Sequence, residues 1–391
     1  MKRRTSLLLA CIAILGASSG CATSGQRAAP RAAAPASPPP PVAAPVEVPA
    51  APAPPSLTAN LPALVEVKSF IQEMAHKHGF DPDALNRQFG QTQPQRKILD
   101  AIARPAEAKP WHAYRQLFLT ETRIQDGARF WSQYAPMLQQ ASARYGVPPE
   151  YLVAILGVET SYGRNTGSYR VMDALATLGF FHPRRGAFFR SELENFLLLC
   201  REERIDPLSP KGSYAGAMGL PQFMPSSFRR FAADLDGDAK RDIWTNPGDA
   251  VASVASYFAA HGWQNGAPVA FPAQVKGAAW RSLLDSEPKP DHSAAEARQK
   301  GVTTPATLAG DTPVKLLQMD ELDGPGHWLT LQNFYVITRY NHSPLYAMAV
   351  HELAQAIRQR HGSASSMTNR QESRFAPLPG GPEGGVQRGT P

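Results

Sequence analysis

The chain contains 391 residues, 43% of them hydrophobic and 19% charged, and has a formal net charge of +7. This length allows two or three domains and a sizeable buried core. A basic balance favours an anionic partner, but the basic residues are scattered and form no nucleic-acid recognition motif, which argues against a nucleic-acid-binding protein. Three cysteines, Cys11, Cys21 and Cys200, are too few for a disulfide framework, and Cys200 in an apolar helix is expected to be a buried, inert thiol.

The first 21 residues have the pattern of an export signal. Three basic residues at positions 2–4 precede an apolar stretch over residues 6–17 that is too short to span a bilayer. We expect residues 1–21 to be a lipoprotein signal peptide and the thiol of Cys21 to carry the lipid. Ser18 stands where such sites usually have leucine, so ordinary secretion with an unmodified Cys21 is the alternative.

The rest of the chain divides by composition and periodicity. Alanine and proline dominate residues 22–58, which predicts an extended linker. Helical periodicity continues to Trp263, and the later segments PVAFPAQV, PVKLLQMDEL and HWLTLQNFYVITRY predict a small β-containing insertion. The predicted units after the linker are 59–145, a helical subdomain; 146–264, a helical core; 265–334, the β-containing insertion; 335–362, the completion of the core; and 363–391, a disordered tail.

The segment AILGVETSYG, residues 154–163, places Glu159 near the end of an apolar helix. Pro148 and Pro149 can begin this helix, and the residues that follow are apolar on nearly every face, which predicts burial. An ionised carboxylate is costly to bury without a partner. Glu159 is therefore either a structural acid paired with arginine or backbone groups, or a general acid held protonated near neutral pH.

A second distinctive segment, KGSYAGAMGLPQFMPSSF, spans residues 211–228. Its small residues allow backbone to approach a ligand closely, although alone it is also consistent with a tight turn into a helix. GVETSYGRNTG and YAGAMGLPQFMPSS, followed by DIW and SYFAAHGW, occur in one order along the chain. With these motifs the chain resembles, over about residues 60–362, lytic murein transglycosylases of the B type, which cut the glycan strands of bacterial peptidoglycan.

The resemblance implies a mainly α (α+β) fold, with a lysozyme-like helical core, a helical subdomain and a small β-containing subdomain. It places the single catalytic glutamate at Glu159. Residues matching the family's substrate groove are Tyr114, Arg184, Arg185, Ser213, Gln222, Phe223, Tyr257, Tyr340, Asn341 and Tyr346. Phe188 stands where some members have tyrosine, which keeps the aromatic face and puts a hydrogen bond in doubt. Aromatic faces suit sugar rings, and arginines suit carboxylates.

The implied reaction is cleavage of the β-1,4 bond between N-acetylmuramic acid and N-acetylglucosamine. A two-carboxylate glycosidase needs a second acid across the sugar ring, and the facing segment KGSYAGAMGLPQF has none. With Glu159 as single general acid and base, the sugar's C6 hydroxyl replaces water and leaves 1,6-anhydromuramic ends. The alternatives are a hydrolytic muramidase and a catalytically silent peptidoglycan-binding lipoprotein.

The segment DLDGDAKRDIWTNPGD, residues 234–249, suggests a Ca²⁺ site. Asp234, Asp236 and Asp238 alternate, the carbonyl of Lys240 follows, and Asp249 can close the site. Against this, Ala239 stands where the EF-hand pattern requires glycine, and an acidic solvated turn is the alternative. Because the resembled family has a calcium loop here, we expect a structural Ca²⁺ and no organic cofactor.

The expected surroundings follow from the signal and the resemblance. We expect a monomer at the periplasmic face of the outer membrane of a Gram-negative bacterium, bound to the membrane by its lipid and acting on peptidoglycan glycan strands; a soluble periplasmic protein is the alternative. The motif HELAQ does not predict a zinc protease, because Gln355 replaces the second histidine, so His351 and Glu352 are expected to be ordinary exposed helix residues.

Overall fold

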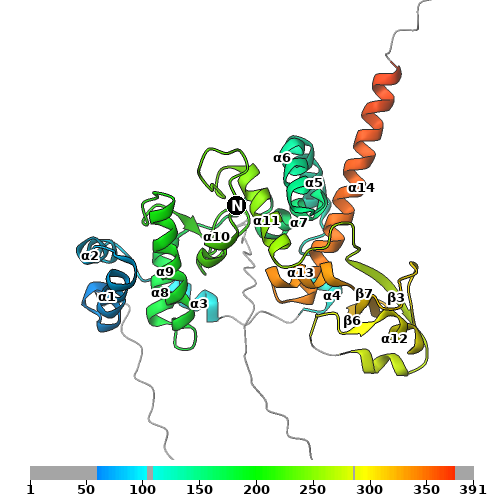
Figure 1. The fold of residues 1–391 in the computed structure, drawn as a ribbon, viewed down its shortest axis with the longest axis horizontal. Helices are drawn as coiled ribbons and strands as arrows, with labels where there is room; N and C mark the ends of the chain where they lie inside the picture. The colour runs from blue at the N-terminus through cyan, green and yellow to red at the C-terminus, as the bar shows by residue number, and fades with distance from the viewer. Residues whose placement is uncertain (1–59, 104–108, 285–286, 375–391) are drawn as a thin grey trace, which may run out of the picture.

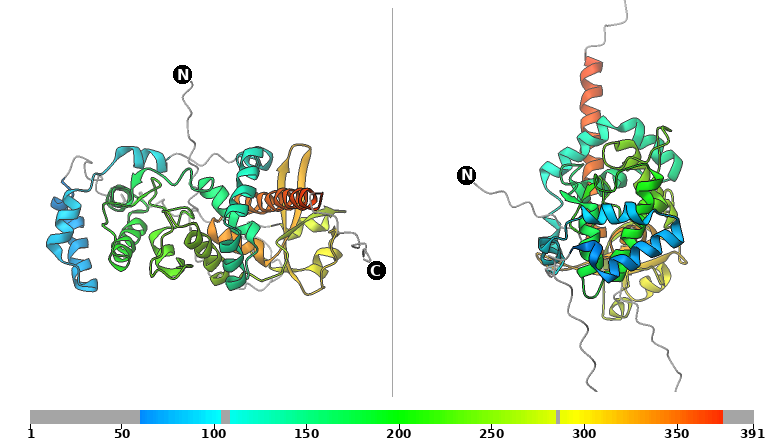
Figure 2. Two further views of the ribbon diagram at one scale, coloured as in Figure 1. Left: turned by 90° about the horizontal axis from the view of Figure 1, so that it is seen from above. Right: turned by 90° about the vertical axis from the view of Figure 1, so that its left-hand side faces the viewer.

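The computed structural model describes residues 60–103, 109–284 and 287–374, drawn in colour in Figure 1. The predicted signal peptide, Cys21 and the whole of the predicted linker lie outside the described residues. Figures 1 and 2 show an elongated arrangement, with α1 and α2 at one end, the main sheet at the other and a helical core between them.

The chain up to Ala260 is almost entirely helical, as predicted. The elements are η1 (Leu61–Ala63), α1 (Val65–His78), α2 (Pro82–Gly90), α3 (Arg96–Ala103), α4 (Trp111–Arg115), α5 (Glu121–Gln133), α6 (Ala135–Tyr145), α7 (Pro149–Thr160), α8 (Val171–Phe181), α9 (Gly186–Glu202), α10 (Pro225–Phe231) and α11 (Pro247–Ala260). Two short strands, β1 (Tyr169–Arg170) and β2 (Lys211–Gly212), pair antiparallel and bring the start of the segment 211–228 beside the chain that follows α7.

The later part forms a small antiparallel sheet and two closing helices. The elements are β3 (Ala270–Val275), η2 (Ala279–Leu283), β4 (His292–Ser293), α12 (Ala294–Gln299), β5 (Val302–Thr303), β6 (Pro313–Glu321), β7 (Gly324–Thr330), α13 (Gln332–Tyr340) and α14 (Pro344–Arg374). The strand order is β4-β6-β7-β3-β5, and β6 and β7 form a hairpin in which Glu321 pairs with Gly324. A separate hydrophobic cluster that includes Trp280, Leu316 and Leu329 fills this unit.

Two predictions for this part were wrong. The segment HWLTLQNFYVITRY is a strand only to Thr330; QNFYVITRY forms α13, where Phe334, Val336 and Ile337 are buried in the main core. Tertiary packing on a helix face outweighs the strand propensity of β-branched residues here. The predicted tail does not begin at residue 363, because α14 continues to Arg374. A single glycine, Gly362, costs a helix only about 1 kcal/mol and does not end it.

Helix α7 lies inside the main core. It contacts α5, α6, α11 and α14, and every residue from Glu150 to Gly157 is buried. Because neighbours cover it on all sides, the helix needs apolar residues on nearly every face, as the sequence indicated. The packing around α7 therefore fixes the position of its last turn.

Cys200 and His351 are both buried. Cys200 is buried, as predicted, and burial raises the pKa of its thiol. His351 is also buried, so the prediction of an exposed histidine was wrong. Its Nδ1 lies 2.9 Å from the hydroxyl of Tyr151, and burial lowers the pKa of the imidazole to about 4. In the described part of the chain, no helix is long and apolar enough to cross a membrane.

Replacing Gly157 by alanine should destabilise the protein. A Cβ atom at Gly157 would lie 2.5 Å from the hydroxyl oxygen and 2.8 Å from Cζ of Tyr162, so the ring or α7 must move. Overpacking of this kind costs about 1–3 kcal/mol in the free energy of unfolding, measurable by urea denaturation. Gly90→Ala is the matched control, because a Cβ there meets nothing within 4 Å. Equal stability of the two variants would contradict the tight contact.

Candidate active site

The backbone turns sharply after Glu159. Helix α7 ends at Thr160, and the next two residues, Ser161 and Tyr162, have φ angles of 51° and 62°. Left-handed backbone is unfavourable for residues other than glycine, by about 1–2 kcal/mol each, so other contacts must hold this turn. The Nη2 of Arg123 donates to the Ser161 hydroxyl at 3.1 Å, and the Tyr162 hydroxyl donates to the Arg123 carbonyl at 2.9 Å. Arg123 of α5 thereby holds the residues that follow the glutamate.

Glu159 as a whole residue is half-buried, and its carboxyl group lies close to Tyr340 and Tyr346. The hydroxyl of Tyr346, in the first turns of α14, donates to Glu159 Oε1 at 2.6 Å. Burial raises the pKa of Glu159 to about 7, while the hydrogen bond from Tyr346 acts in the opposite direction. At neutral pH both the protonated and the ionised form are therefore populated, as a group that gives and later takes a proton requires.

Tyrosines surround Glu159. Burial raises the pKa values of Tyr340 and Tyr346 well above the ordinary value, with smaller contributions from the Glu159 charge. In the described part of the chain, the ionisable neighbours that shift the pKa values of Glu159, Tyr340 and Tyr346 are Glu159 itself and tyrosines. These phenols stay neutral and can donate hydrogen bonds.

An aromatic cluster extends from Tyr340. Its ring centroid lies 4.8 Å from that of Tyr257 and 5.9 Å from that of Phe223. The Tyr340 hydroxyl donates to the Pro221 carbonyl at 2.6 Å, and the Tyr257 hydroxyl donates to the Arg339 carbonyl at 2.5 Å. The structure thus brings Phe223, Tyr257 and Tyr340 together from three separate parts of the chain, and places them beside Glu159 through Tyr340.

The segment 211–224 is a folded loop held against the end of α7. The Thr160 hydroxyl lies 3.0 Å from the Leu220 carbonyl, which fixes the loop one residue after the glutamate. Gln222 has φ of 52°, and its Nε2 donates to the carbonyls of Gly219 and Thr166. The Ser213 hydroxyl is buried and accepts from the Ala217 amide at 3.0 Å. In this structure Gln222 and Ser213 therefore stabilise the loop itself.

The remaining predicted residues lie in three places. Arg185 lies over the rings of Phe188 and Phe189 at the start of α9, each 5.0 Å from its guanidinium carbon, and Phe188 and Arg184 are exposed. Tyr114 is buried, and its ring centroid lies 5.2 Å from that of Phe118. It is close enough to Tyr346 to contribute to the raised pKa of that phenol.

Asn341, which follows α13, is buried, and its Oδ1 accepts from the Ser343 amide at 3.2 Å. It lies next to Tyr340 in the chain, on the segment that leads into α14.

The acidic loop gathers three of its predicted metal ligands. Carboxylate oxygens of Asp234, Asp236 and Asp249 lie within 4.8 Å of one another. Asp249 is fully buried, and burial raises the pKa of its carboxyl, with the charges of Asp236 and Asp234 adding to the effect. Ala239 has φ of 67°, so it adopts the left-handed conformation that glycine has in an EF-hand loop. An all-oxygen donor set with converging negative charge fits a hard cation such as Ca²⁺.

The two other predicted ligands are placed differently. The carboxylate of Asp238 does not belong to the cluster of Asp234, Asp236 and Asp249; its Oδ1 accepts from the Lys240 amide at 2.9 Å. Asp238 is exposed, so solvent screens its charge. The geometry therefore does not support Asp238 as a Ca²⁺ ligand beside Asp234, Asp236 and Asp249.

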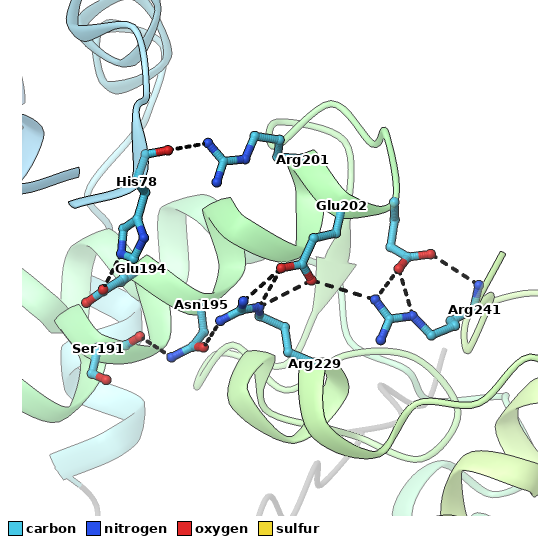
Figure 3. Close-up of polar contacts among 9 residues, drawn as sticks. His78, Ser191, Glu194, Asn195, Arg201, Glu202, Arg229 and Arg241 are labelled. Carbon is cyan, nitrogen blue, oxygen red and sulfur yellow. Dashed lines mark hydrogen bonds and ion pairs between the residues drawn. The ribbon is translucent and has the colours of Figure 1, made fainter. Parts of the chain in front are cut away.

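The acidic loop is anchored on both sides. Figure 3 shows Arg241 beside Glu202, with Arg229 between Glu202 and Asn195. The Arg241 Nε donates to Glu203 Oε1 at 2.7 Å. On the other side, the Leu220 amide donates to the Ile243 carbonyl at 2.9 Å. The loop thus supports the segment that carries Gln222 and Phe223.

Three residues that hold the site were not singled out from the sequence. Arg123, Thr160 and Tyr162 fix the turn after Glu159. Arg123 contacts Ser161 and Tyr162, and Thr160 contacts Leu220; in each case the two partners are far apart in the sequence. Thr160 and Tyr162 belong to the quoted motif AILGVETSYG, so the motif itself was a signal. No pattern in the sequence indicated the role of Arg123, which lies on α5.

Comparisons with known proteins agree with this geometry. The family model described as Transglycosylase SLT domain matches residues 64–355. Membrane-bound lytic murein transglycosylase B of Escherichia coli (strain K12) is 44% identical over 300 residues, which cover 74% of this chain and 82% of that protein. The solved structure of soluble lytic transglycosylase SltB1 from Pseudomonas aeruginosa has a TM-score of 0.74 at 50% identity, covering 76% of this chain and 99% of that one.

The structure of Escherichia coli lytic transglycosylase Slt35 in complex with calcium has a TM-score of 0.70 at 43% identity, covering 75% of this chain and 93% of that one. A lysozyme-like helical core with one carboxyl group among tyrosines defines a class of glycan-cleaving enzymes. This chain belongs to the lytic transglycosylase family.

Glu159 should lower the stability of the protein at neutral and alkaline pH. Because its folded-state pKa is about 7 and its ordinary value is 4.5, the native state keeps a proton that the unfolded state has lost between these pH values. The contribution to the free energy of unfolding therefore falls as pH rises through this window. Glu159→Gln removes it, so the variant should gain about 1–3 kcal/mol over the parent from pH 4 to pH 8, by denaturant titration. A constant difference at all pH values would show that the carboxyl has an ordinary pKa.

Proposed function

We propose that this enzyme cleaves the β-1,4 bond between N-acetylmuramic acid and N-acetylglucosamine without water and leaves 1,6-anhydromuramic ends. The observation that carries the proposal is Glu159, a carboxyl group with a pKa of about 7 that accepts a hydrogen bond from the Tyr346 hydroxyl at 2.6 Å. Solved relatives support the substrate class. SltB3 from Pseudomonas aeruginosa, 32% identical, has been solved in complex with NAG-NAM-pentapeptide and with NAG-anhNAM-pentapeptide.

The first step is protonation. Glu159, neutral in a large fraction of molecules at pH 7, donates its proton to the glycosidic oxygen as the bond from that oxygen to the sugar C1 breaks. The 4-hydroxyl of N-acetylglucosamine is then free. The acetamido oxygen of the muramic sugar stabilises the positive charge at C1. In the same step Glu159 becomes a carboxylate, and the hydrogen bond from Tyr346 strengthens because its acceptor is now charged.

The second step closes the anhydro ring. The Glu159 carboxylate takes the proton of the C6 hydroxyl as O6 attacks C1, which restores the neutral acid and completes the cycle. Attack within one molecule has a large entropic advantage over attack by water. Tyr340 and Tyr346 are neutral at neutral pH, so neither phenol adds a negative charge beside the Glu159 carboxylate.

Digestion products test the reaction. Purified peptidoglycan digested in ¹⁸O-water should yield 1,6-anhydromuramic ends with no label, measured by mass spectrometry. Glu159→Gln should lower turnover by about 10³-fold or more while glycan binding remains, because the variant keeps the shape and loses the proton. Labelled reducing-end muramic acid would show a hydrolytic muramidase. Unchanged turnover in the variant would remove Glu159 from the mechanism, and no turnover by the parent enzyme would favour a silent binding lipoprotein.

We further propose a structural Ca²⁺ in the acidic loop, held by Asp234, Asp236 and Asp249. The geometry of the loop and the calcium complex of Slt35 support it. The ion would supply positive charge to three converging carboxylates. The loop residues themselves connect this site to the catalytic region, because the amide of Asp242 donates to Asp249 and the neighbouring Ile243 carbonyl accepts from Leu220.

Thermal unfolding with and without calcium tests this site. Added Ca²⁺ should raise the melting temperature over that in chelator, since a ligand that binds only the folded state stabilises it, and Asp236→Ala should reduce the rise. Asp323→Ala is the matched control, because Asp323 is an exposed acid in the β6–β7 turn. Identical melting curves in calcium and chelator would leave only an acidic turn.

The cellular setting is also proposed. We place the enzyme in the bacterial envelope, at the periplasmic face of the outer membrane, as a monomer anchored through lipid on Cys21. The name of the membrane-bound Escherichia coli relative supports an envelope location. A soluble periplasmic enzyme is the alternative.

A further inference from the structure

A second groove lies behind the segment that follows Glu159. It has a volume of about 390 Å³ and is formed by α5, the start of α6, the segment 161–164, Leu220 and the first residue of α11. None of the residues expected to bind the glycan strand lines it. The groove is therefore separate from the predicted catalytic surface, although both share the chain around Glu159.

The groove has an excess of positive charge. Asp126 is buried in its wall, and both Arg129 and Arg164 form ion pairs with its carboxylate. Arg123 is close enough for the Arg164 charge to lower the pKa of its guanidinium, after the larger effect of burial. Two guanidiniums and one carboxylate thus line the groove, which leaves one positive charge in excess. Pro247 at the groove begins α11, whose first turn also carries the buried Asp249.

The two outer arginines are free to bind more. The side chains of Arg129 and Arg164 are 74% and 55% exposed, and each contacts Asp126 through Nη2. A guanidinium has five N–H donors in a planar fork, so each retains donors directed away from Asp126. Asp126 holds the pair in position, and a carboxylate entering the groove would meet two oriented forks.

Aromatic rings form the other wall. The ring centroid of Phe130 lies 4.7 Å from that of Tyr134 and 5.7 Å from that of Tyr162. Apolar faces beside oriented cations suit a short peptide that carries carboxylates on an aliphatic frame. A neutral sugar would leave the excess charge of the arginines unmatched.

The occupant would touch the turn that carries Glu159. Ser161 and Tyr162 line the groove, and both have left-handed backbone. The Tyr162 hydroxyl fits between α5 and α7 only because Gly127 and Gly157 have no Cβ; either Cβ would lie 2.5 Å from it. A ligand against Tyr162 therefore acts on a tightly packed turn two residues after the catalytic acid.

We propose that this groove binds a carboxylate-bearing stem peptide of peptidoglycan, outside the glycan-cleaving site. This rests on the proposed function for the choice of ligand. The stem peptide carries its carboxylates several bonds away from the sugar, whereas a peptide-free strand has only the lactyl carboxylate on the sugar itself. The groove therefore gives the enzyme a means to favour peptide-bearing over peptide-free strands.

Calorimetric titration with the free tetrapeptide L-Ala-γ-D-Glu-meso-diaminopimelate-D-Ala tests the site. The parent enzyme should bind it, and the fully amidated peptide should bind at least tenfold more weakly. The double variant Arg129→Gln/Arg164→Gln should weaken tetrapeptide binding by tenfold or more. Arg87→Gln, at a 69% exposed arginine of α2, is the control and should bind as the parent does. Equal binding by the double variant, or no binding by the parent, overturns the proposal.

A second variant avoids the buried ion pairs. Tyr134→Ala removes part of the aromatic wall without touching Asp126, so it should fold normally and weaken the tetrapeptide several-fold. It is decisive if the double arginine variant does not fold, and unchanged affinity would again overturn the proposal.

Turnover separates this inference from the proposed function. With peptide-bearing peptidoglycan the double variant should have a several-fold higher KM than the parent, and with amidase-treated, peptide-free glycan the two should be equal. Equal loss on both substrates would assign the arginines to the stability of the Glu159 turn. If the parent cleaves neither substrate, the proposed function fails, while the titration still decides whether the groove binds peptide.

Discussion

The hydrogen bond between Tyr346 and Glu159 joins residues that are 187 positions apart in the sequence, and the candidate active site depends on it. Glu159 is at the end of α7, which lies inside the core, and Tyr346 is at the start of α14, which packs against α7. Burial favours the neutral acid and the tyrosine favours the carboxylate, so the two effects set the pKa near 7. A change in the packing of α7 on α14 would therefore alter chemistry as well as stability.

The residues around this pair serve to hold a strained turn. The left-handed Ser161 and Tyr162 are kept in place by Arg123, and Thr160 ties the turn to the segment 219–223. That segment in turn accepts support from the acidic loop through Ile243. The acidic loop, the glycine-rich segment and the catalytic turn form one continuous set of hydrogen bonds, which gives a structural cation a physical route to influence the site without contacting substrate.

The same turn has a second face. Its catalytic side presents Glu159 to the tyrosines, and the opposite side lines a basic groove with Arg129, Arg164 and Tyr162. An enzyme that acts on a polymer carrying both sugars and peptides has reason to recognise each. Because Ser161 and Tyr162 line the groove and follow Glu159 closely in the chain, a peptide bound in the groove can change the position of the Glu159 carboxyl group.

Much of the fold and the main candidate residue could be predicted from the sequence. The apolar periodicity indicated a helical core and a buried Glu159, and the resemblance of the motifs to lytic transglycosylases implied the roles of Glu159 and of Asp234, Asp236 and Asp249 in the acidic loop. Local patterns carry this information because burial requires apolar residues at helical spacing and loops require small or acidic residues.

Only the tertiary structure decided which side chains contact one another. Tyr346 beside Glu159, Arg123 on Ser161 and the pairing of Asp126 with Arg164 each join residues far apart in sequence, and no periodicity reports such contacts. It also decided that QNFYVITRY is a helix, that His351 is buried and that the cluster of acidic oxygens comes from Asp234, Asp236 and Asp249. In each case the free energy of packing or solvation at one place in the folded chain outweighed the local preference of the residues, and that term exists only once the chain has folded.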